Sequence, residues 1–342
     1  MIDNVPFIVR DQITINKFLS NEALTIISST ESYDQKTGEI RERRIFKYRN
    51  LTFKFLFASN KQPFELRVSG SLHYFKNNGC HNADDFSYFE IVEILTNFQI
   101  TFDINLKYLR LLPFEFGINF PIIYKPDYVV FNIFYEQRKL FTNNVGNIPS
   151  KISGNNNCDY SLKVYSKSDQ FPNECPENTI RWEVKLRRTR VLKKYNIETV
   201  ADLLKFETYK ILKKVHLEYF QHLVLYDYTI KIPTKGKYKN FLDKYRIALN
   251  WKILIEEIKS GKGYETKYND KVKLLNRASK LYGSNMLSNL LNLANLKWDE
   301  LLIIPCVPSK FEIKKPKHAQ KTKPKHAPYI MCIPTRCPET IF

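Results

Sequence analysis

Apolar and polar positions alternate with a period of two through much of the first two-thirds of the chain, a pattern that is typical of β-strands. The segments that show it are also rich in aromatic and β-branched residues. Strands are predicted in residues 46–59, 64–75, 114–123, 128–135, 160–167 and 179–188. A polar loop rich in Asn, Ser and Gly is predicted over residues 142–160.

A helical period replaces the strand period in one internal segment and again after residue 198, where apolar residues recur at every third or fourth position. Helices are predicted over residues 84–100, 198–220, 240–259 and 268–296. The expected N-caps are Asp84 or Asp85 for the first helix and Asn196 or Thr199 for the second.

These elements together predict an α+β fold: a mainly antiparallel β-sheet core with helices packed on one face, followed by a helical extension. We expect the core to occupy residues 1–235 and the extension residues 236–305. Residues 306–342 form a basic, Pro- and Lys-rich tail in which KPKHA occurs twice. Such a composition cannot pack a core, so the tail is expected to be a flexible arm that binds polyanions.

The net charge narrows the choice of partner. The chain has 342 residues, with 54 Lys and Arg against 35 Asp and Glu, and its formal charge is +19. A hydrophobic content of 43% allows a large core and excludes general disorder. The charge favours nucleic acid over a membrane surface, because no basic amphipathic anchor stands out. No apolar run reaches the roughly 18 residues that a membrane-spanning helix requires.

The cysteines and the first residues indicate the compartment. The six cysteines contain no CxxC pair, which fits neither a zinc site nor a compact disulfide framework. The first residues lack a basic segment followed by an apolar one, so no secretory signal is expected. We therefore expect ordinary thiols in a reducing cytoplasm.

Three of the predicted strands have one apolar and one polar face, because neighbouring side chains on a strand point in opposite directions. The apolar face carries Phe114, Phe116, Ile118, Phe120, Tyr160, Leu162, Val164, Trp182, Val184 and Leu186. The polar face carries Glu115, Gly117, Asn119, Lys163, Tyr165, Lys167, Arg181, Glu183, Lys185 and Arg187, which we expect to lie outside the core. A fourth strand would place Arg67, Ser69, Ser71 and His73 together.

If these strands share a sheet, the polar face combines carboxylates, lysines and a tyrosine, which is the set that phosphodiester chemistry requires. Carboxylates are suitable ligands for Mg²⁺ or Mn²⁺, and such a metal polarises a phosphate. A tyrosine can attack the phosphate and form a covalent ester. Neighbouring lysines can lower the phenol pKa and neutralise the developing charge.

Four segments resemble, in order, motif blocks of the rolling-circle replication initiators of phages and plasmids that the filamentous-phage gene II protein represents. SGSLHYFKNNGCHNADDF (69–86) is similar to the early block of the family, and LLPFEFGINF (111–120) to the strand that carries an acidic residue. SLKVYSKSDQF (161–171) resembles the Tyr-x-Lys block. Residues 179–206 resemble the Arg-aromatic-Glu strand, the basic stretch and the helix that follow. The resemblance spans roughly residues 65–210.

The resemblance implies a metal-dependent endonuclease and strand transferase that nicks origin DNA through a tyrosine and stays attached to the 5′-phosphate. By position, Tyr165 is the nucleophile, with Lys167 in support. The Mg²⁺ or Mn²⁺ ligands would be Glu115, Glu183 and His81, with His73 as a further contributor. DNA would bind Lys163, Lys185, Arg187, Arg188, Arg190, Lys193 and Lys194. Host helicase and polymerase are the expected partners, in the cytoplasm of a bacterial host.

Several alternatives stay open at this stage. Tyr160 is the second choice of nucleophile, although alternation places it on the apolar face. Many rolling-circle nucleases bind their metal through His-x-His, which this chain lacks, and His81 could instead cap a turn. A protein of the same fold could bind the origin without cutting it. A basic protein that coats nucleic acid would explain the charge, but not the ordered blocks.

Overall fold

The computed structural model describes residues 1–33, 40–143, 150–153 and 158–303. Its strands form two sheets in which every pair of neighbours is antiparallel, and this confirms the predicted α+β class. The predicted tail, residues 306–342, lies outside the described residues. None of the described helices combines the length and apolar character that crossing a membrane requires.

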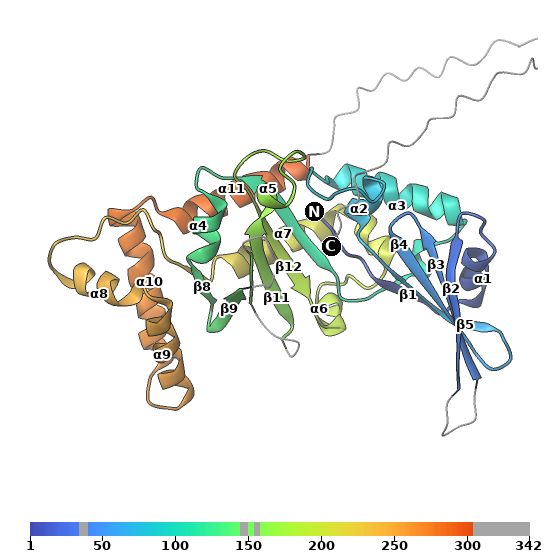
Figure 1. Cartoon of the computed structure of the whole chain (residues 1–342), viewed down its shortest axis with the longest axis horizontal. Helices are drawn as coiled ribbons and strands as arrows, with labels where there is room; N and C mark the ends of the chain where they lie inside the picture. The colour runs from blue at the N-terminus through green and yellow to red at the C-terminus, as the bar shows by residue number, and fades with distance from the viewer. Residues whose placement is uncertain (34–39, 144–149, 154–157, 304–342) are drawn as a thin grey trace, which may run out of the picture. The chain divides into compact units, whose positions relative to one another are not determined.

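The first sheet has the strand order β2-β3-β4-β5-β1-β6. Its strands are β1 (Phe7–Val9), β2 (Thr25–Tyr33), β3 (Ile40–Tyr48), β4 (Leu51–Phe57), β5 (Pro63–Ser69) and β6 (Arg110–Leu111). Helices α1 (Gln12–Leu19) and α3 (Tyr88–Phe102) pack on this sheet (Figure 1). Phe18 and Phe102 meet at 4.9 Å between ring centroids, and each contacts Phe53 of β4 at 5.6 Å. These aromatic contacts hold both helices against the sheet.

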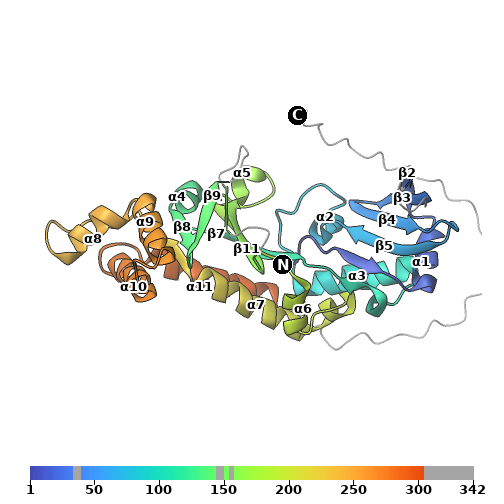
Figure 2. The same ribbon diagram turned by 90° about the horizontal axis from the view of Figure 1, so that it is seen from below.

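The second sheet has the order β13-β8-β9-β10-β11-β12-β7. Its strands are β7 (Glu115–Pro121), β8 (Ile133–Glu136), β9 (Lys139–Asn143), β10 (Ser150–Ser153), β11 (Tyr160–Ser166), β12 (Thr179–Leu186) and β13 (Leu223–Leu225). Helices α7 (Phe206–Phe220) and α11 (Met286–Leu301) run side by side along this sheet (Figure 2). Trp182 of β12 stacks on Phe220 at 4.3 Å, so these helices cover the predicted apolar face.

Two predicted strands are partly helical. Residues 128–131 belong to α4 (Pro126–Phe131), because Pro126 at the first helical turn favours a helix start, and the strand begins only at Ile133. The predicted strand 64–75 ends at Ser69, and α2 (Leu72–Lys76) follows with Ser71 as its N-cap. The proposed fourth strand of the polar face is therefore wrong: β5 belongs to the first sheet, and His73 lies on a helix.

The helical predictions are correct in type, but their boundaries differ. Ser87, not Asp84 or Asp85, caps α3 through a capping box with Glu90. Thr199 precedes a 3₁₀ turn, η2 (Val200–Leu204), after which α7 begins. The remaining helices are α8 (Lys237–Tyr245), α9 (Ala248–Lys259), α10 (Glu265–Tyr282) and α11, and the short ones η1 (Leu106–Tyr108), α5 (Lys167–Gln170) and α6 (Thr189–Lys194).

The predicted extension divides between two hydrophobic cores. Helices α8, α9 and α10 share a core around Trp251 with residues of β8 and β13. Helix α11 instead contributes Trp298 and its neighbours to the large core of the two sheets. A left-handed Asn285 (φ 55°) separates α10 from α11, where the sequence predicted one helix. The boundary at residues 235 and 236 stays a prediction.

Candidate active site

The register of β7, β12 and β11 brings the predicted polar side chains together. Glu183 of β12 lies opposite Lys163 of β11 and Gly117 of β7. In the next row of the same face, Arg181 lies between Tyr165 and Asn119. The two glutamates and Tyr165 therefore share one face of one sheet, as alternation predicts.

Gly117 is required by the close approach of β7 to β12. A Cβ at this position would lie 2.2 Å from the Trp182 carbonyl oxygen and 2.8 Å from the Glu183 Cα. Real Cβ atoms do not approach a backbone atom so closely, so any other residue would push the two strands apart. The glycine thus keeps the strands that carry Glu115 and Glu183 at their short separation.

The centre of the polar face is covered, in contrast to the expectation that its side chains lie outside, whereas Glu115, Lys163 and Lys185 at its border are half-buried. Arg181 is 2% exposed and Glu183 is 4% exposed. Residues 1–4 run beside β7 through an isolated bridge between Ile2 and Phe116, and the Asp3 amide donates to the Glu115 carbonyl at 3.0 Å. The loop after α2 also reaches this face, since Asn119 donates to the Ala83 carbonyl at 2.9 Å. Strand alternation distinguishes the two faces, but it cannot reveal which segments cover them.

Arg181 is the centre of a buried polar cluster. Its guanidinium donates from Nε to Glu183 at 3.1 Å, from Nη1 to Asn119 at 2.9 Å and from Nη2 to Asp3 at 3.2 Å. Asp3 also accepts from Asn82 at 2.9 Å. A buried guanidinium is stable only when its donors are satisfied, and here two carboxylates and an amide satisfy them.

Glu115 and Glu183 form a close pair of carboxyl groups whose pKa values shift in opposite directions. Burial raises the pKa of Glu183, and its neighbour Glu115 adds to this effect against the opposing charge of Arg181. Burial also acts on Glu115, but hydrogen bonds with Glu183 and Lys185 lower its pKa. Burial and the neighbouring Glu115 therefore favour the protonated form of Glu183, while Lys185 favours the carboxylate form of Glu115.

Tyr165 lies beside this pair and is 6% exposed. Its surroundings are charged rather than apolar, because the Lys163 and Lys167 ammonium groups lie 4.7 and 5.5 Å from its ring centroid. Burial raises the pKa of the Tyr165 phenol well above its ordinary value, and the charge of Arg181 opposes this rise. The phenol is therefore neutral in this conformation and would need a base to become a nucleophile.

Tyr160 occupies the opposite face of β11. Its ring stacks on Tyr219 of α7 at 3.7 Å, and its hydroxyl donates to the buried carboxylate of Glu136 at 2.7 Å. Burial and Glu136 both raise the pKa of Tyr160. This arrangement agrees with the alternation argument that separates Tyr160 from Glu115 and Glu183.

The sequence pattern predicts Lys167 on a strand, but in the structure it is the first residue of α5. It is fully buried, and its ammonium donates to Asn82 at 2.6 Å and to Gln170 at 2.9 Å. Burial, with the charge of Arg181, lowers its pKa to about 7. Lys167 therefore loses its proton at a lower pH than an exposed lysine does.

The predicted metal ligands are only partly brought together. His81 lies near Asn77 at 3.3 Å and Asp84 at 3.6 Å, and does not join the glutamate pair. His73 is buried against Asp84 at 2.7 Å, and burial lowers its pKa to about 4. Within residues 1–33, 40–143, 150–153 and 158–303, no group of three or more His, Cys, Asp or Glu side chains could hold a metal ion.

The carboxylates present do not fit a metal site in this conformation. Glu115 is already paired with Lys185, and Glu183 accepts from Arg181 while burial raises its pKa. A divalent ion requires deprotonated ligands, so it would have to displace both partners. We therefore assign no chemical step to a metal.

The predicted DNA-binding residues are spread over the end of β12 and the helix after it. Lys163 and Lys185 border the cluster, and the Arg187 Nε donates to Ser161 at 3.2 Å. Arg188 is the N-cap of α6, and Arg190 on that helix pairs with Asp159 at 2.6 Å. Lys193 and Lys194 are exposed on the last turn of the same helix.

Sequence reasoning missed four polar residues of this cluster. Asn82 and Asn119 lay within the motif segments, but neither had been assigned a role. Asp3 gave no signal, because it is 178 positions away from Arg181 in the sequence. Tyr74 of α2 also borders the cluster, and burial with the neighbouring Asp3 raises its pKa.

No family model matches this chain, and no curated protein matches it. Among solved structures, it is similar to a rolling circle replication initiator protein from Geobacillus stearothermophilus. The two share 10% sequence identity, with 75% of this chain and 95% of the other covered and a TM-score of 0.34. A score at this level does not establish a common fold, so the site is interpreted from its own residues.

Proposed function

We propose that this protein initiates rolling-circle replication by nicking one strand of origin DNA with Tyr165. The single observation that carries the proposal is the register that sets Tyr165 beside Arg181, and Arg181 beside the glutamate pair, on one sheet face. The order of the four sequence blocks supports it, because the last three blocks contain the three adjacent strands β7, β11 and β12.

The reaction we propose is a transfer of the phosphoryl group from the 3′-oxygen of DNA to a tyrosine. The Tyr165 oxygen would attack phosphorus and lose its proton to the neutral form of Lys167, while the bond from phosphorus to the 3′-oxygen breaks. Arg181 would stabilise the added negative charge on the phosphate, and protonated Glu183 would supply a proton to the leaving 3′-oxygen. The products would be a 5′-phosphotyrosine and a free 3′-OH, which primes synthesis; the reverse reaction rejoins the displaced strand.

The covering segments must move before DNA can reach this site. Residues 1–4 and the loop after α2 make the contacts that bury Arg181 and Glu183. In this proposal the phosphate replaces Asp3 as the anionic partner of Arg181, so the guanidinium keeps a partner throughout.

The test is cleavage of single-stranded and supercoiled DNA from the protein's own replicon, with Mg²⁺, Mn²⁺ or EDTA, analysed on denaturing gels. Wild type should leave protein on the 5′ end of the nick, and Tyr165→Phe should leave none. Tyr160→Phe is the matched control, since it removes the same hydroxyl from the opposite face of β11. A nick that survives in Tyr165→Phe would assign the nucleophile to Tyr160 or Tyr74.

A second candidate function is origin binding without cleavage. Two observations favour it. Tyr165 is buried, and among the described residues no group of three or more His, Cys, Asp or Glu side chains could hold a metal ion. Under this alternative the protein binds origin DNA tightly and specifically, but no covalent product forms with any metal. Binding without sequence preference would instead favour a protein that coats nucleic acid. Recruitment of host helicase and polymerase in a bacterial cytoplasm belongs to the initiator proposal alone.

A further inference from the structure

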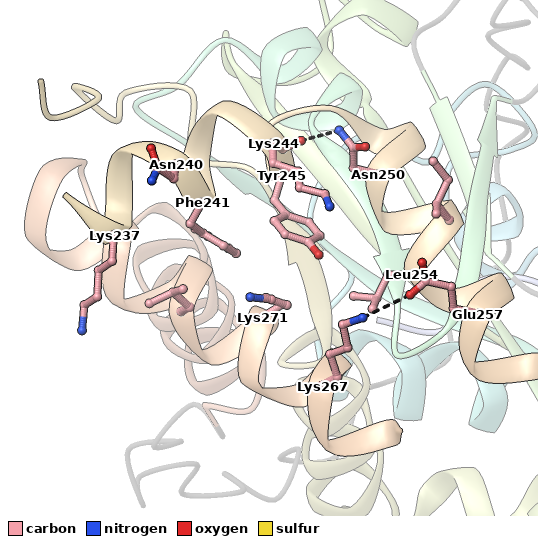
Figure 3. A pocket seen from close by; sticks show the side chains of 12 residues that line it. Lys237, Asn240, Phe241, Lys244, Tyr245, Asn250, Leu254, Glu257, Lys267 and Lys271 are labelled. Atoms are coloured by element: carbon pink, nitrogen blue, oxygen red, sulfur yellow. Dashed lines mark hydrogen bonds and ion pairs between the residues drawn. The ribbon is translucent and has the colours of Figure 1, made fainter. Parts of the chain in front are cut away.

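A cavity of about 520 Å³ lies among α8, α9 and α10, in the part of the chain that the nicking site does not use. Lysines dominate its polar lining: Lys237, Lys244, Lys267 and Lys271. Asn240 and Asn250 add amide groups, and Phe241 and Tyr245 form part of its apolar wall (Figure 3). We call this site the lysine cavity.

Most of the ammonium groups in the lysine cavity lack a carboxylate partner. Lys267 is paired with Glu257 at 3.2 Å. No ion pair to Lys237, Lys244 or Lys271 occurs among the described residues. These three ammonium groups are therefore available to an anion that enters the cavity, and no existing ion pair has to break.

Two buried aromatic rings form a low-dielectric wall beside the lysines of the lysine cavity. The Lys271 ammonium lies 5.8 Å from the ring centroid of Phe241 and 5.7 Å from that of Tyr245. Both rings are only 5% exposed, so they provide a low-dielectric wall rather than a free stacking surface for bases. A cleft lined with charges of one sign and with low-dielectric walls focuses the field and attracts counter-ions.

The surrounding helices have the same sign of charge. Residues 237–282 contain twelve Lys and Arg against five Asp and Glu, a net charge of +7. The concentration of lysine ammonium groups and the buried aromatic faces fit recognition of phosphates and not of bases. We propose that the lysine cavity is a second DNA-binding site, in which Lys237, Lys244 and Lys271 hold phosphates of the DNA backbone.

This inference rests on the proposed function, because that function makes DNA the polyanion. It assigns to α8–α10 a contact with DNA that is separate from the nicking site. Since phosphate contacts carry no sequence information, the cavity would strengthen binding and fix the orientation of the duplex without reading the origin sequence.

The test is fluorescence anisotropy of a labelled origin duplex titrated with the full chain over a range of salt concentrations. The variant combines Lys237→Gln, Lys244→Gln and Lys271→Gln. We expect at least about tenfold weaker binding, and a salt dependence of log K that is less steep by about 0.9 for each phosphate that the variant no longer neutralises. The thermal unfolding transition should stay unchanged, because the three substitutions break no ion pair between described residues and leave a polar side chain with the first two methylenes in place.

The matched control combines Lys252→Gln, Lys259→Gln and Lys280→Gln, which remove the same charge from exposed positions outside the cavity. If both triple variants bind the duplex equally weakly, the general charge of the helices binds DNA and the lysine cavity is refuted. An unchanged affinity in the cavity variant refutes it as well.

Nicking of a single-stranded origin oligonucleotide is measured separately. If wild type binds the duplex through the cavity but never nicks, the proposed function fails and the inference stands. If wild type nicks and the cavity variant binds as tightly as wild type, the proposed function stands and the inference fails.

Discussion

Replacing Arg181 with methionine should destabilise the protein strongly, because the change leaves buried carboxylates without their cation. Arg181 is 2% exposed and makes hydrogen bonds to Asp3, Asn119 and Glu183. Removal of one partner from a buried ion pair costs about 3–5 kcal/mol, whereas Met retains most of the side-chain volume. We expect Arg181→Met to lower the free energy of unfolding by about this amount at pH 7, measured by urea denaturation.

The destabilisation should depend on pH in a defined direction. Burial already raises the pKa of Glu183, and removing Arg181 raises it further, because that charge lowers it. An acid whose pKa is higher in the folded than in the unfolded state loses stability as pH rises through the folded pKa. The loss of unfolding free energy caused by Arg181→Met should therefore become smaller as the pH is lowered from 7 to 5.

The double variant Arg181→Met, Glu183→Gln provides the control, since it removes the carboxylate together with its cation. It should recover about 0.5–3 kcal/mol relative to the sum of the two single variants. The opposite outcomes are that Arg181→Met destabilises the protein by less than about 1 kcal/mol, or that its loss of unfolding free energy grows at low pH. Either result would refute a stabilising role for the buried hydrogen bonds of Arg181.

Three further predictions concern stability. Asp227→Ala should cost about 3 kcal/mol in chemical denaturation, because the buried carboxylate accepts from Ser279 at 2.6 Å and from the Ser284 and Met286 amides at 3.0 and 3.2 Å; an effect near zero contradicts this role. Burial lowers the pKa of His216 to about 3, so stability should fall as pH decreases from 6.5, by up to about 1.4 kcal/mol per unit. His216→Gln should have a shallower pH slope, and an unchanged slope would count against this assignment. Gly117→Ala should cost at least about 2 kcal/mol in thermal or urea unfolding, since its Cβ would overlap the Trp182 carbonyl, and a fully stable variant would show that β7 and β12 can separate.

Local alternation predicted the two faces of the second sheet because it depends only on the strand period. The apolar residues Phe116, Ile118 and Trp182 are at most 1% exposed, and Glu115 and Glu183 lie together on the opposite face. The same reasoning failed for residues 128–131, where an apolar run also fits a short helix and Pro126 decides between the two.

The contacts that complete the site could not be predicted in this way, because they join segments far apart in the sequence. Asp3 reaches Arg181 across 178 positions and Asn82 reaches Lys167 across 85. No periodicity specifies such pairs, since they depend on how the two sheets and their connecting loops pack. The same long-range contacts cover the polar face, so Arg181 and Glu183 are buried instead of exposed as the sequence predicts.

The segment that covers the site also connects the two sheets, and this has a consequence for how the site opens. Ile2 bridges to Phe116 of β7, while Asn4 bridges to Ser71 after β5. Asp3, between them, binds Arg181 and also accepts from the Ser71 hydroxyl. A phosphate that displaces Asp3 from Arg181 would therefore release one side chain that links the site to the first sheet. Under the proposed function, access of DNA to Tyr165 would thus be coupled to the contact between the two sheets, and substitutions at Ser71 should change nicking without touching the reacting groups.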